Sequence, residues 1–190
     1  PIVGRWVIIA TERARRPSDL VRPQPPATPG LCPFCPSQED KTPHEVYVAG
    51  RPPSTPPNRP GWTVRVVPNR FPALKIEGDL DREAEGIYDR MNGIGAHEVI
   101  IETPRHDRQM KDLSDAELTE VLFSFKARIL DLRNDLRFRY ILLFKNQGQL
   151  AGASLDHAHS QLIALPVVPR QVVEEIEGAK RHYEHKERCI

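Results

Sequence analysis

The chain has 190 residues, of which 27 are Lys or Arg and 26 are Asp or Glu, so its formal net charge is +1. This length suits one domain with an appendage, and the balanced charge provides no general attraction for nucleic acid or an anionic membrane. No apolar run approaches the roughly 20 residues that span a bilayer, and the first residues lack the apolar core of a signal peptide. We therefore expect a cytoplasmic protein.

The first half of the chain predicts short strands separated by long irregular segments. Residues 4–10 and 62–67 are apolar or alternating runs that predict strands. Between them, residues 17–60 are rich in proline and show no helical or strand period, which predicts an ordered but irregular excursion. Residues 75–92 are acidic and polar and predict a solvated loop, whereas the apolar run at 97–102 predicts another strand.

The second half contains the clearest helical pattern. A capping box begins at Ser114 and precedes an apolar stripe with helical spacing, which predicts a helix of about five turns that ends near Asn134. Residues 140–145 and 161–165 predict strands, and residues 170–186 predict a charged helix. Because the strands surround one long helix without a βαβ rhythm, we predict an α+β domain with a mainly antiparallel sheet.

Cys32 and Cys35 form a C-x-x-C motif inside the irregular excursion. This spacing lets two thiolates face one tetrahedral Zn²⁺. A redox C-x-x-C normally opens a helix after a strand, and the prolines at 33 and 36 do not fit that setting. A metal site is therefore favoured. Its other ligands must come from distant segments, and the candidates are His44, His97, His106 and His157.

Residues 146–161 join two predicted strands and carry most of the candidate chemistry. Gly148 and Gly152 allow the backbone to approach a ligand closely and to direct N–H groups at an anion such as phosphate. Residues two apart on a strand share a face, which predicts a polar row of His157, His159 and Gln161. A hairpin with two purely structural histidines is the alternative, but the clustering of ligand-type residues favours a site.

The turn at 68–72 follows the second predicted strand and supplies further candidates. Asn69 and Phe71 in this turn could contact a nucleobase. A strand-ending turn with a core phenylalanine is the alternative, and it is at least as simple.

Several of these segments together resemble galactose-1-phosphate uridylyltransferase, a family of the histidine-triad superfamily. The matching segments are G-R-W-V-I-I-A at 4–10, C-P-F-C at 32–35, V-R-V-V-P-N-R-F-P-A-L at 64–74, H-E-V-I-I-E at 97–102 and the loop with H-x-H-x-Q at 146–161. The resemblance implies two related halves, each an antiparallel half-barrel with helices. This chain would supply the N-terminal nucleotidyltransferase domain, residues 1–168, and a helix at 169–190 that leads into a second, missing domain. It also implies a homodimer at full length.

The resemblance further implies that His159 is a nucleophile. It would take UMP from UDP-glucose as a uridylyl-histidine and pass it to galactose 1-phosphate, so that the partners are a UDP-hexose and a hexose 1-phosphate. A neutral imidazole is nucleophilic at pH 7 without a separate base. Gln161 would assist catalysis by holding a phosphoryl oxygen. The implied substrate-binding residues are Asn69, Arg70, Phe71, Asn146, Gly152, Ser154 and Gln161.

By the same resemblance, a structural zinc would be bound by Cys32, Cys35, His106 and His157. His44 and His97 are thereby left out. Four protein ligands close the coordination sphere, so the zinc would hold the excursion against the active strand and take no part in the chemistry.

Two departures from the family pattern leave the nucleotide open. The N-R-F sequence at 69–71 has a basic residue where well-studied members have an acidic one. The H-A-H sequence at 157–159 replaces H-P-H and, with Ser160, is similar to plant-type ADP-glucose phosphorylases. An ADP-sugar phosphorylase or adenylyltransferase of the same family is therefore an alternative.

An alternative from another class is a zinc-stabilised nucleotide-binding or nucleic-acid-binding module without catalysis. Such a module would use the C-x-x-C knuckle and nearby basic residues as contacts. Its basic residues should cluster among aromatic side chains, but here they are scattered and aromatics are scarce. The basic candidates are Arg13, Arg15 and Arg16.

Overall fold

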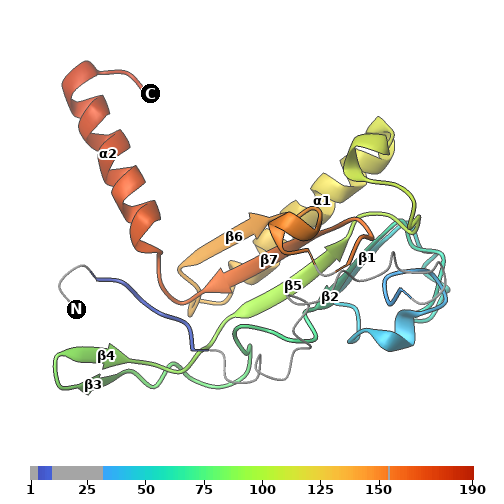
Figure 1. The fold of residues 1–190 in the computed structure, drawn as a ribbon, viewed down its shortest axis with the longest axis horizontal. Coiled ribbons are helices and arrows are strands. Elements are labelled where there is room, and N and C mark those ends of the chain that lie inside the picture. The colour runs from blue at the N-terminus through green and yellow to red at the C-terminus, as the bar shows by residue number, and fades with distance from the viewer. Residues whose placement is uncertain (1–3, 10–31, 154) are drawn as a thin grey trace.

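The computed structural model describes residues 4–9, 32–153 and 155–190. Its main element is a five-stranded sheet with the order β1-β2-β5-β7-β6, in which all neighbouring strands are antiparallel (Figure 1). These strands are β1 (Tyr47–Ala49), β2 (Val64–Pro68), β5 (Ala96–Ile101), β6 (Tyr140–Phe144) and β7 (His159–Leu165). Outside the sheet lie a hairpin of β3 (Glu83–Glu85) and β4 (Tyr88–Arg90), the helices α1 (Asp115–Leu132) and α2 (Arg170–Lys186), and short 3-10 helices at Glu39–Lys41, Met110–Asp112 and Gln149–Ala151. The predicted α+β fold with a mainly antiparallel sheet is confirmed.

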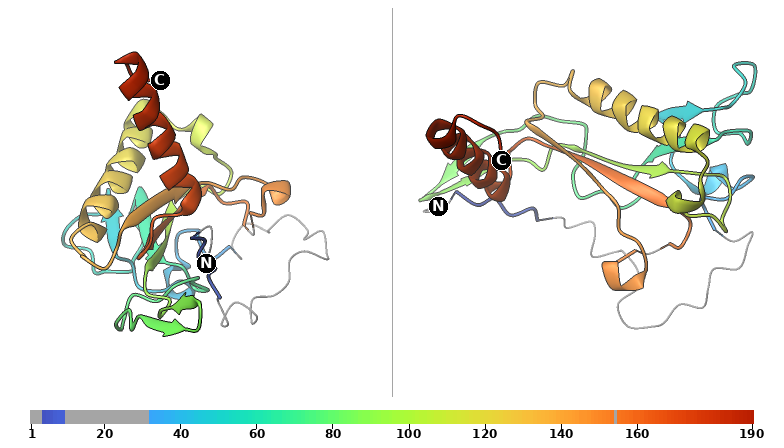
Figure 2. Two further views of the ribbon diagram at one scale, coloured as in Figure 1. Left: turned by 90° about the vertical axis from the view of Figure 1, so that its left-hand side faces the viewer. Right: turned by 90° about the horizontal axis from the view of Figure 1, so that it is seen from above.

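Helix α1 covers one face of the sheet (Figure 2). It begins at the predicted capping box, where the N–H of Ser114 donates to Glu117 Oε2 over 2.8 Å and the N–H of Glu117 donates to Ser114 Oγ over 3.4 Å. Burial of its apolar stripe against the sheet stabilises the fold far more than the cap does. The core between them consists of Val64, Val66, Ala96, Ile100, Val121, Phe125, Leu132, Leu162 and Ala164.

An ion pair fixes α1 on the central strand β5. Arg128 of α1 donates two hydrogen bonds to the Glu98 carboxylate, over 2.8 and 2.7 Å, and both side chains are buried. A bidentate pair of this kind constrains both distance and direction. Consequently, the face of β5 that carries Glu98 belongs to the helix, and its opposite face is available for a site.

The opposite face of the sheet carries the first described residues of the excursion. Cys32 and Phe34 are buried there in a second apolar cluster. Its remaining buried members are Trp62, Val67, Val99 and Ile101.

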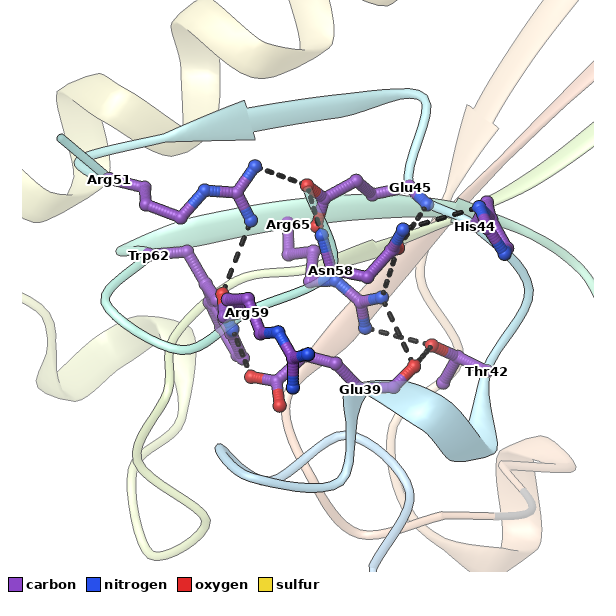
Figure 3. A network of polar contacts seen from close by, with 9 residues as sticks. All are labelled: Glu39, Thr42, His44, Glu45, Arg51, Asn58, Arg59, Trp62 and Arg65. Carbon is purple, nitrogen blue, oxygen red and sulfur yellow. Dashed lines mark hydrogen bonds and ion pairs between the residues drawn. The ribbon is translucent and has the colours of Figure 1, made fainter. Parts of the chain in front are cut away.

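A polar network centred on Arg65 holds the next part of the excursion (Figure 3). The Arg65 side chain is 1% exposed, and its guanidinium donates to Glu45 over 2.9 Å, to Thr42 over 2.8 Å and to Asn58 over 3.1 Å. It also donates to the carbonyl of Glu39 over 3.4 Å. Because the buried Arg65 guanidinium donates to acceptors from several turns, this network fixes residues 39–58 without a metal.

The Glu45 carboxylate in this network predicts a pH dependence of stability. Burial raises the pKa of Glu45, but hydrogen bonds from Arg51, from the Asn58 N–H and from Arg65 outweigh burial and hold the pKa below its ordinary value of 4.5. A carboxyl with a lowered folded-state pKa stabilises the fold above its unfolded pKa, and this contribution is lost as the pH falls through the folded value. We expect Glu45→Gln to lower the free energy of unfolding at pH 7 and to lose most of this effect at pH 3.

Urea unfolding of both proteins at the two pH values measures this difference. Glu184→Gln is the matched control, because Glu184 lies on an exposed face of α2, and it should change stability little at either pH. An effect of Glu45→Gln that is equally large at pH 7 and pH 3 would contradict the role of the ionised carboxylate.

Some local expectations are wrong. The strand that the sequence predicts for residues 4–10 does not form in residues 4–9, where Val7 and Ile9 are 80% and 83% exposed. No described strand pairs with this segment, so its backbone has no ladder to join. The excursion contains β1, whose three residues are too few to produce a detectable period, and the predicted loop at 75–92 contains the exposed β3–β4 hairpin.

Helix α2 forms over the predicted residues 170–186 and points away from the sheet (Figure 1). It has no buried residue. Neither α2 nor any other helix in the described ranges has the length and apolar character needed to cross a membrane. The domain division after residue 168 stays a prediction.

Candidate active site and metal centre

The register between β5 and β7 presents two polar side chains on the face opposite α1. Ile101 pairs with His159, and Val99 pairs with Gln161. Since side chains alternate along a strand, His159 and Gln161 share the face that α1 does not cover. Both line a cavity of about 610 Å³. Other residues that line it are Phe34, Thr42, Asn69, Arg70, Phe71, His97, Phe144, Asn146, Gly152 and Leu155.

This cavity collects the catalytic and substrate-binding candidates from distant parts of the sequence. Every one of those candidates in the described ranges lines it, and Ser154 lies outside those ranges. His157, the third member of the predicted row, packs against Phe34 as His159 does, but it lines a smaller neighbouring cavity instead of this one. The regular strand begins at His159, and the N–H of Glu102 donates to the carbonyl of Ala158 just before it.

The hydrogen bonds of His159 define the state of its ring. Its Nδ1 lies 2.8 Å from the carbonyl oxygen of His157, and a carbonyl can only accept. Nδ1 therefore carries the proton, and Nε2 carries the lone pair. Burial lowers the pKa of His159, and nearby Lys145 acts in the same direction, so the ring is neutral at pH 7. The edge of Phe34 packs against it with ring centroids 5.4 Å apart.

A buried polar cluster fixes the backbone of His159 from the other face of the sheet. Lys145 donates to Glu102 over 2.8 Å and to the carbonyl of His159 over 3.2 Å, and Ser160 donates to Glu102 over 2.6 Å. Glu102 is 1% exposed, so these contacts compensate for its lost hydration. The sequence analysis missed this cluster. Its only local sign is an acidic residue at the end of the apolar run that forms β5.

The loop between β6 and β7 bends around Gly148. The N–H groups of Ala151 and Ala153 both donate to the Gly148 carbonyl over 3.2 Å. Gly148 and Gly152 have φ of 78° and 79°, which glycine adopts without the Cβ strain that other residues would meet. Gly152 lines the cavity, and its predicted contact with a ligand stays a prediction.

The turn after β2 reaches the same cavity. Asn69 Oδ1 accepts the N–H of Phe71 over 2.9 Å, which closes the turn, and the Arg70 guanidinium lies 6.0 Å from the centre of the Phe71 ring. Phe71 is half-buried and lines the cavity. It is a member of neither apolar core cluster.

Four side chains from three segments form a possible metal centre. They are Cys32, Cys35, His106 and His157, and their donor atoms lie within 4.8 Å of one another. The Nδ1 of His157 lies 3.8 Å and 3.6 Å from the two sulfurs, and the Nδ1 of His106 lies 3.5 Å from Cys35 Sγ. Tetrahedral zinc with ordinary bond lengths separates its sulfur and nitrogen ligands by about 3.6 Å. The cluster could therefore hold a metal ion.

The protonation states of His157 and Cys32 suit the binding of a cation. His157 Nε2 lies 2.7 Å from the Thr103 carbonyl, so Nε2 carries the proton and Nδ1 offers its lone pair to the sulfurs. Burial lowers the pKa of His157 to about 4 and raises the pKa of the Cys32 thiol to about 11. The imidazole is thus ready to bind, whereas the thiol ionises at pH 7 only when a bound cation replaces its proton.

Comparison with known proteins identifies the family of this chain. The family model described as galactose-1-phosphate uridyl transferase, N-terminal domain, matches residues 1–169. The chain belongs to this family. ADP-glucose phosphorylase of Arabidopsis thaliana is 37% identical over 194 residues, covering 100% of this chain and 54% of that protein. Galactose-1-phosphate uridylyltransferase of Thermotoga maritima is 25% identical over 190 residues, covering 100% and 52%. The chain thus spans about half the length of these curated relatives.

Solved structures of the family have the same fold. An ADP-glucose phosphorylase from Arabidopsis thaliana with bound ADP-glucose superimposes with a TM-score of 0.69 at 33% identity, over 100% of this chain and 54% of that one. A uridylyltransferase structure superimposes with a TM-score of 0.72 at 28% identity, over 100% and 52%. The resemblance that the sequence motifs carry is therefore confirmed at the level of the family.

Proposed function

We propose that this chain carries the reaction site of a nucleotidyltransferase that works through a covalent histidine. The observation that carries the proposal is the presentation of His159, whose Nε2 lone pair belongs to a neutral ring at the wall of a nucleotide-sized cavity. The cavity also holds Gln161, Asn146 and Gly152, which are suited to binding a phosphate group.

In the first step, the Nε2 lone pair of His159 attacks the α-phosphorus of a nucleotide sugar. The bond from that phosphorus to the bridging oxygen breaks, and sugar 1-phosphate leaves with the electron pair. In the second step, a phosphate oxygen of the acceptor attacks the same phosphorus, and the N–P bond breaks to return its electrons to Nε2. The proton stays on Nδ1 throughout, hydrogen-bonded to the His157 carbonyl, so neither step needs a proton transfer at the ring.

The other residues of the cavity would bind and orient the substrate. The Gln161 amide donates to a phosphoryl oxygen and stabilises charge with a fixed dipole. It is a poor proton donor, which favours a phosphate acceptor over water. Asn146, Gly152 and the predicted Ser154 would hold the phosphates. The turn of Asn69, Arg70 and Phe71 would hold the ribose and base.

The metal centre would hold zinc in a structural role. Its four protein ligands close a tetrahedral sphere, so the ion would supply rigidity and no catalytic chemistry. His157 is two residues from His159, and its backbone carbonyl accepts the hydrogen bond of the His159 Nδ1–H. A ligand bond to His157 would therefore also fix the orientation of the His159 ring.

Two substrate pairs are candidates, and we infer that ADP-glucose and inorganic phosphate are favoured over UDP-glucose and galactose 1-phosphate. The higher identity to the Arabidopsis phosphorylase, 37% against 25% for the Thermotoga uridylyltransferase, supports this order. The H-A-H sequence at 157–159 supports it as well. We further expect a cytoplasmic homodimer at full length.

Isotope exchange tests the proposal. A ping-pong enzyme exchanges labelled glucose 1-phosphate into its nucleotide sugar without any second acceptor. We expect the kcat/KM of exchange to be at least about tenfold higher with ADP-glucose than with UDP-glucose, which corresponds to about 1.4 kcal/mol of transition-state discrimination. The opposite preference would restore the uridylyltransferase assignment. Nucleotide binding without exchange in either pair would overturn the proposed reaction and leave a binding module.

A further inference from the structure

His97 of β5 is a buried histidine that lies between two parts of the candidate site. It belongs to the same face of the sheet as Gln161, and it is 7% exposed. Its Nε2 lies 3.0 Å from Gln161 Oε1 and 3.1 Å from Asn69 Nδ2, and its Nδ1 lies 3.2 Å from the backbone nitrogen of Ala73. The ring therefore contacts both the residue beside the phosphoryl site and the turn beside the nucleotide.

The contact with Ala73 determines which ring nitrogen carries the proton. A backbone N–H can only donate, so Nδ1 of His97 must accept. The proton of the neutral ring is then on Nε2, which makes Nε2 a donor. Of the two side-chain atoms named above, the Gln161 oxygen is the one that can accept this hydrogen bond, because the Asn69 amide nitrogen is itself a donor and Asn69 Oδ1 is engaged by the N–H of Phe71.

This hydrogen bond fixes the orientation of the Gln161 amide. An amide can rotate by a half-turn and exchange its oxygen with its nitrogen at little steric cost. With the oxygen held by His97, the NH₂ group is the end that remains for the cavity. In the reversed orientation, the carbonyl oxygen would meet a phosphoryl oxygen and repel it. The orientation that His97 holds therefore stabilises negative charge on the phosphoryl oxygens, and the reversed orientation opposes it.

We propose that His97 is a positioning residue that holds Gln161 as a hydrogen-bond donor toward the transferred phosphoryl group. This inference rests on the proposed nucleotidyl transfer and assigns a residue to it that lies outside the metal centre. His97 acts only through Gln161 and the adjoining turn, and it does not itself touch the reacting atoms. The His97 ring accepts the N–H of Ala73 and donates to Gln161, and the His97 carbonyl accepts the N–H of Asn69, so the nucleotide end and the phosphoryl end of the cavity are held in one arrangement.

A double-mutant cycle on the exchange reaction tests this role. We expect His97→Phe, which keeps the ring volume and removes the donor, to lower the kcat of exchange by about tenfold, with KM changed less than about threefold. Gln161→Leu should lower kcat by about 100-fold. The double variant should be no slower than Gln161→Leu alone, because the orientation of an absent amide cannot matter. His97→Gln, which can still donate, should recover part of the rate, and the exposed His185→Phe on α2 should leave it unchanged.

Additive losses in the cycle, or a His97→Phe variant with unchanged kcat, would overturn the proposal. Nitrogen-15 NMR of the free wild-type protein provides a reading that depends on neither activity nor a variant. It should show the Nε2–H tautomer of His97 and a Gln161 side-chain amide shifted by its hydrogen bond, whereas the Nδ1–H tautomer would overturn the inference. A wild-type protein that performs no exchange but shows the Nε2–H tautomer would refute the proposed function while leaving the hydrogen bond established.

Discussion

His159→Ala is expected to reduce nucleotidyl exchange by about 10⁴-fold or more, the largest effect of any single substitution in this chain. The variant removes the nitrogen that would form the N–P bond. The cavity wall also contains the imidazole of His97, but its Nδ1 lone pair accepts the N–H of Ala73. Binding of the nucleotide sugar should change far less, because the base, ribose and phosphate contacts remain. The measurements are the exchange rate and the affinity of the variant for ADP-glucose and UDP-glucose.

His185→Ala is the matched control for this loss. It removes an exposed imidazole from α2, whose Nδ1 contacts the carbonyl of Arg181 in the same helix, and it should leave exchange unchanged. A His159→Ala variant that keeps more than about 1% of the wild-type rate would exclude His159 as the nucleophile, since loss of a covalent catalyst costs orders of magnitude more.

The second large effect concerns the metal centre. Cys35→Ser should reduce bound zinc from one ion per chain to nearly none, because the tetrahedral sphere loses a thiolate. We expect the melting temperature to fall by about 10 °C, since a loss of 3 kcal/mol or more shifts a protein of this size by about 6–12 °C. The exchange rate should fall as well, because His157 loses its ligand bond and no longer fixes the His159 ring.

Cys189→Ser is the control, because Cys189 is exposed and outside the cluster. It should change neither zinc content nor melting temperature. Hydrogen exchange should locate the effect of Cys35→Ser at residues 32–38 and around His157, while residues 39–58 stay protected by the Arg65 network. A Cys35→Ser variant that keeps one zinc ion per chain would contradict this account. So would a variant in which hydrogen exchange speeds up as much at residues 39–58 as at residues 32–38.

Local patterns in the sequence predict much of this site. The capping box at Ser114 and the apolar stripe that follows it predict α1, because the signals for a helix lie within a few residues of one another in the sequence. Likewise, the alternation of side chains predicts that His159 and Gln161 share a face. His157 contacts the two cysteines of the excursion, and no local period shows that the fold brings these segments together.

Contacts between distant segments could not be read in the same way. Arg65 stands in an apolar run and is buried because Glu45, Thr42 and Asn58 fold over it from the excursion. The pairing of His97 with Gln161 depends on the register of β5 against β7, which no local period encodes. The strand predicted for residues 4–10 does not form in residues 4–9 for the same reason. Apolar residues form a strand only where a neighbouring strand pairs with them.

The most direct test of the covalent histidine is the intact mass of the zinc-loaded, full-length gene product after incubation with ADP-glucose or UDP-glucose and no acceptor. The proposed reaction predicts a gain of one nucleoside monophosphate, located on His159 by fragmentation and removed by the matching phosphate acceptor. The nucleotide that labels the protein would also identify the base. An unmodified protein with both nucleotide sugars, or an adduct on a different residue, would contradict transfer through His159.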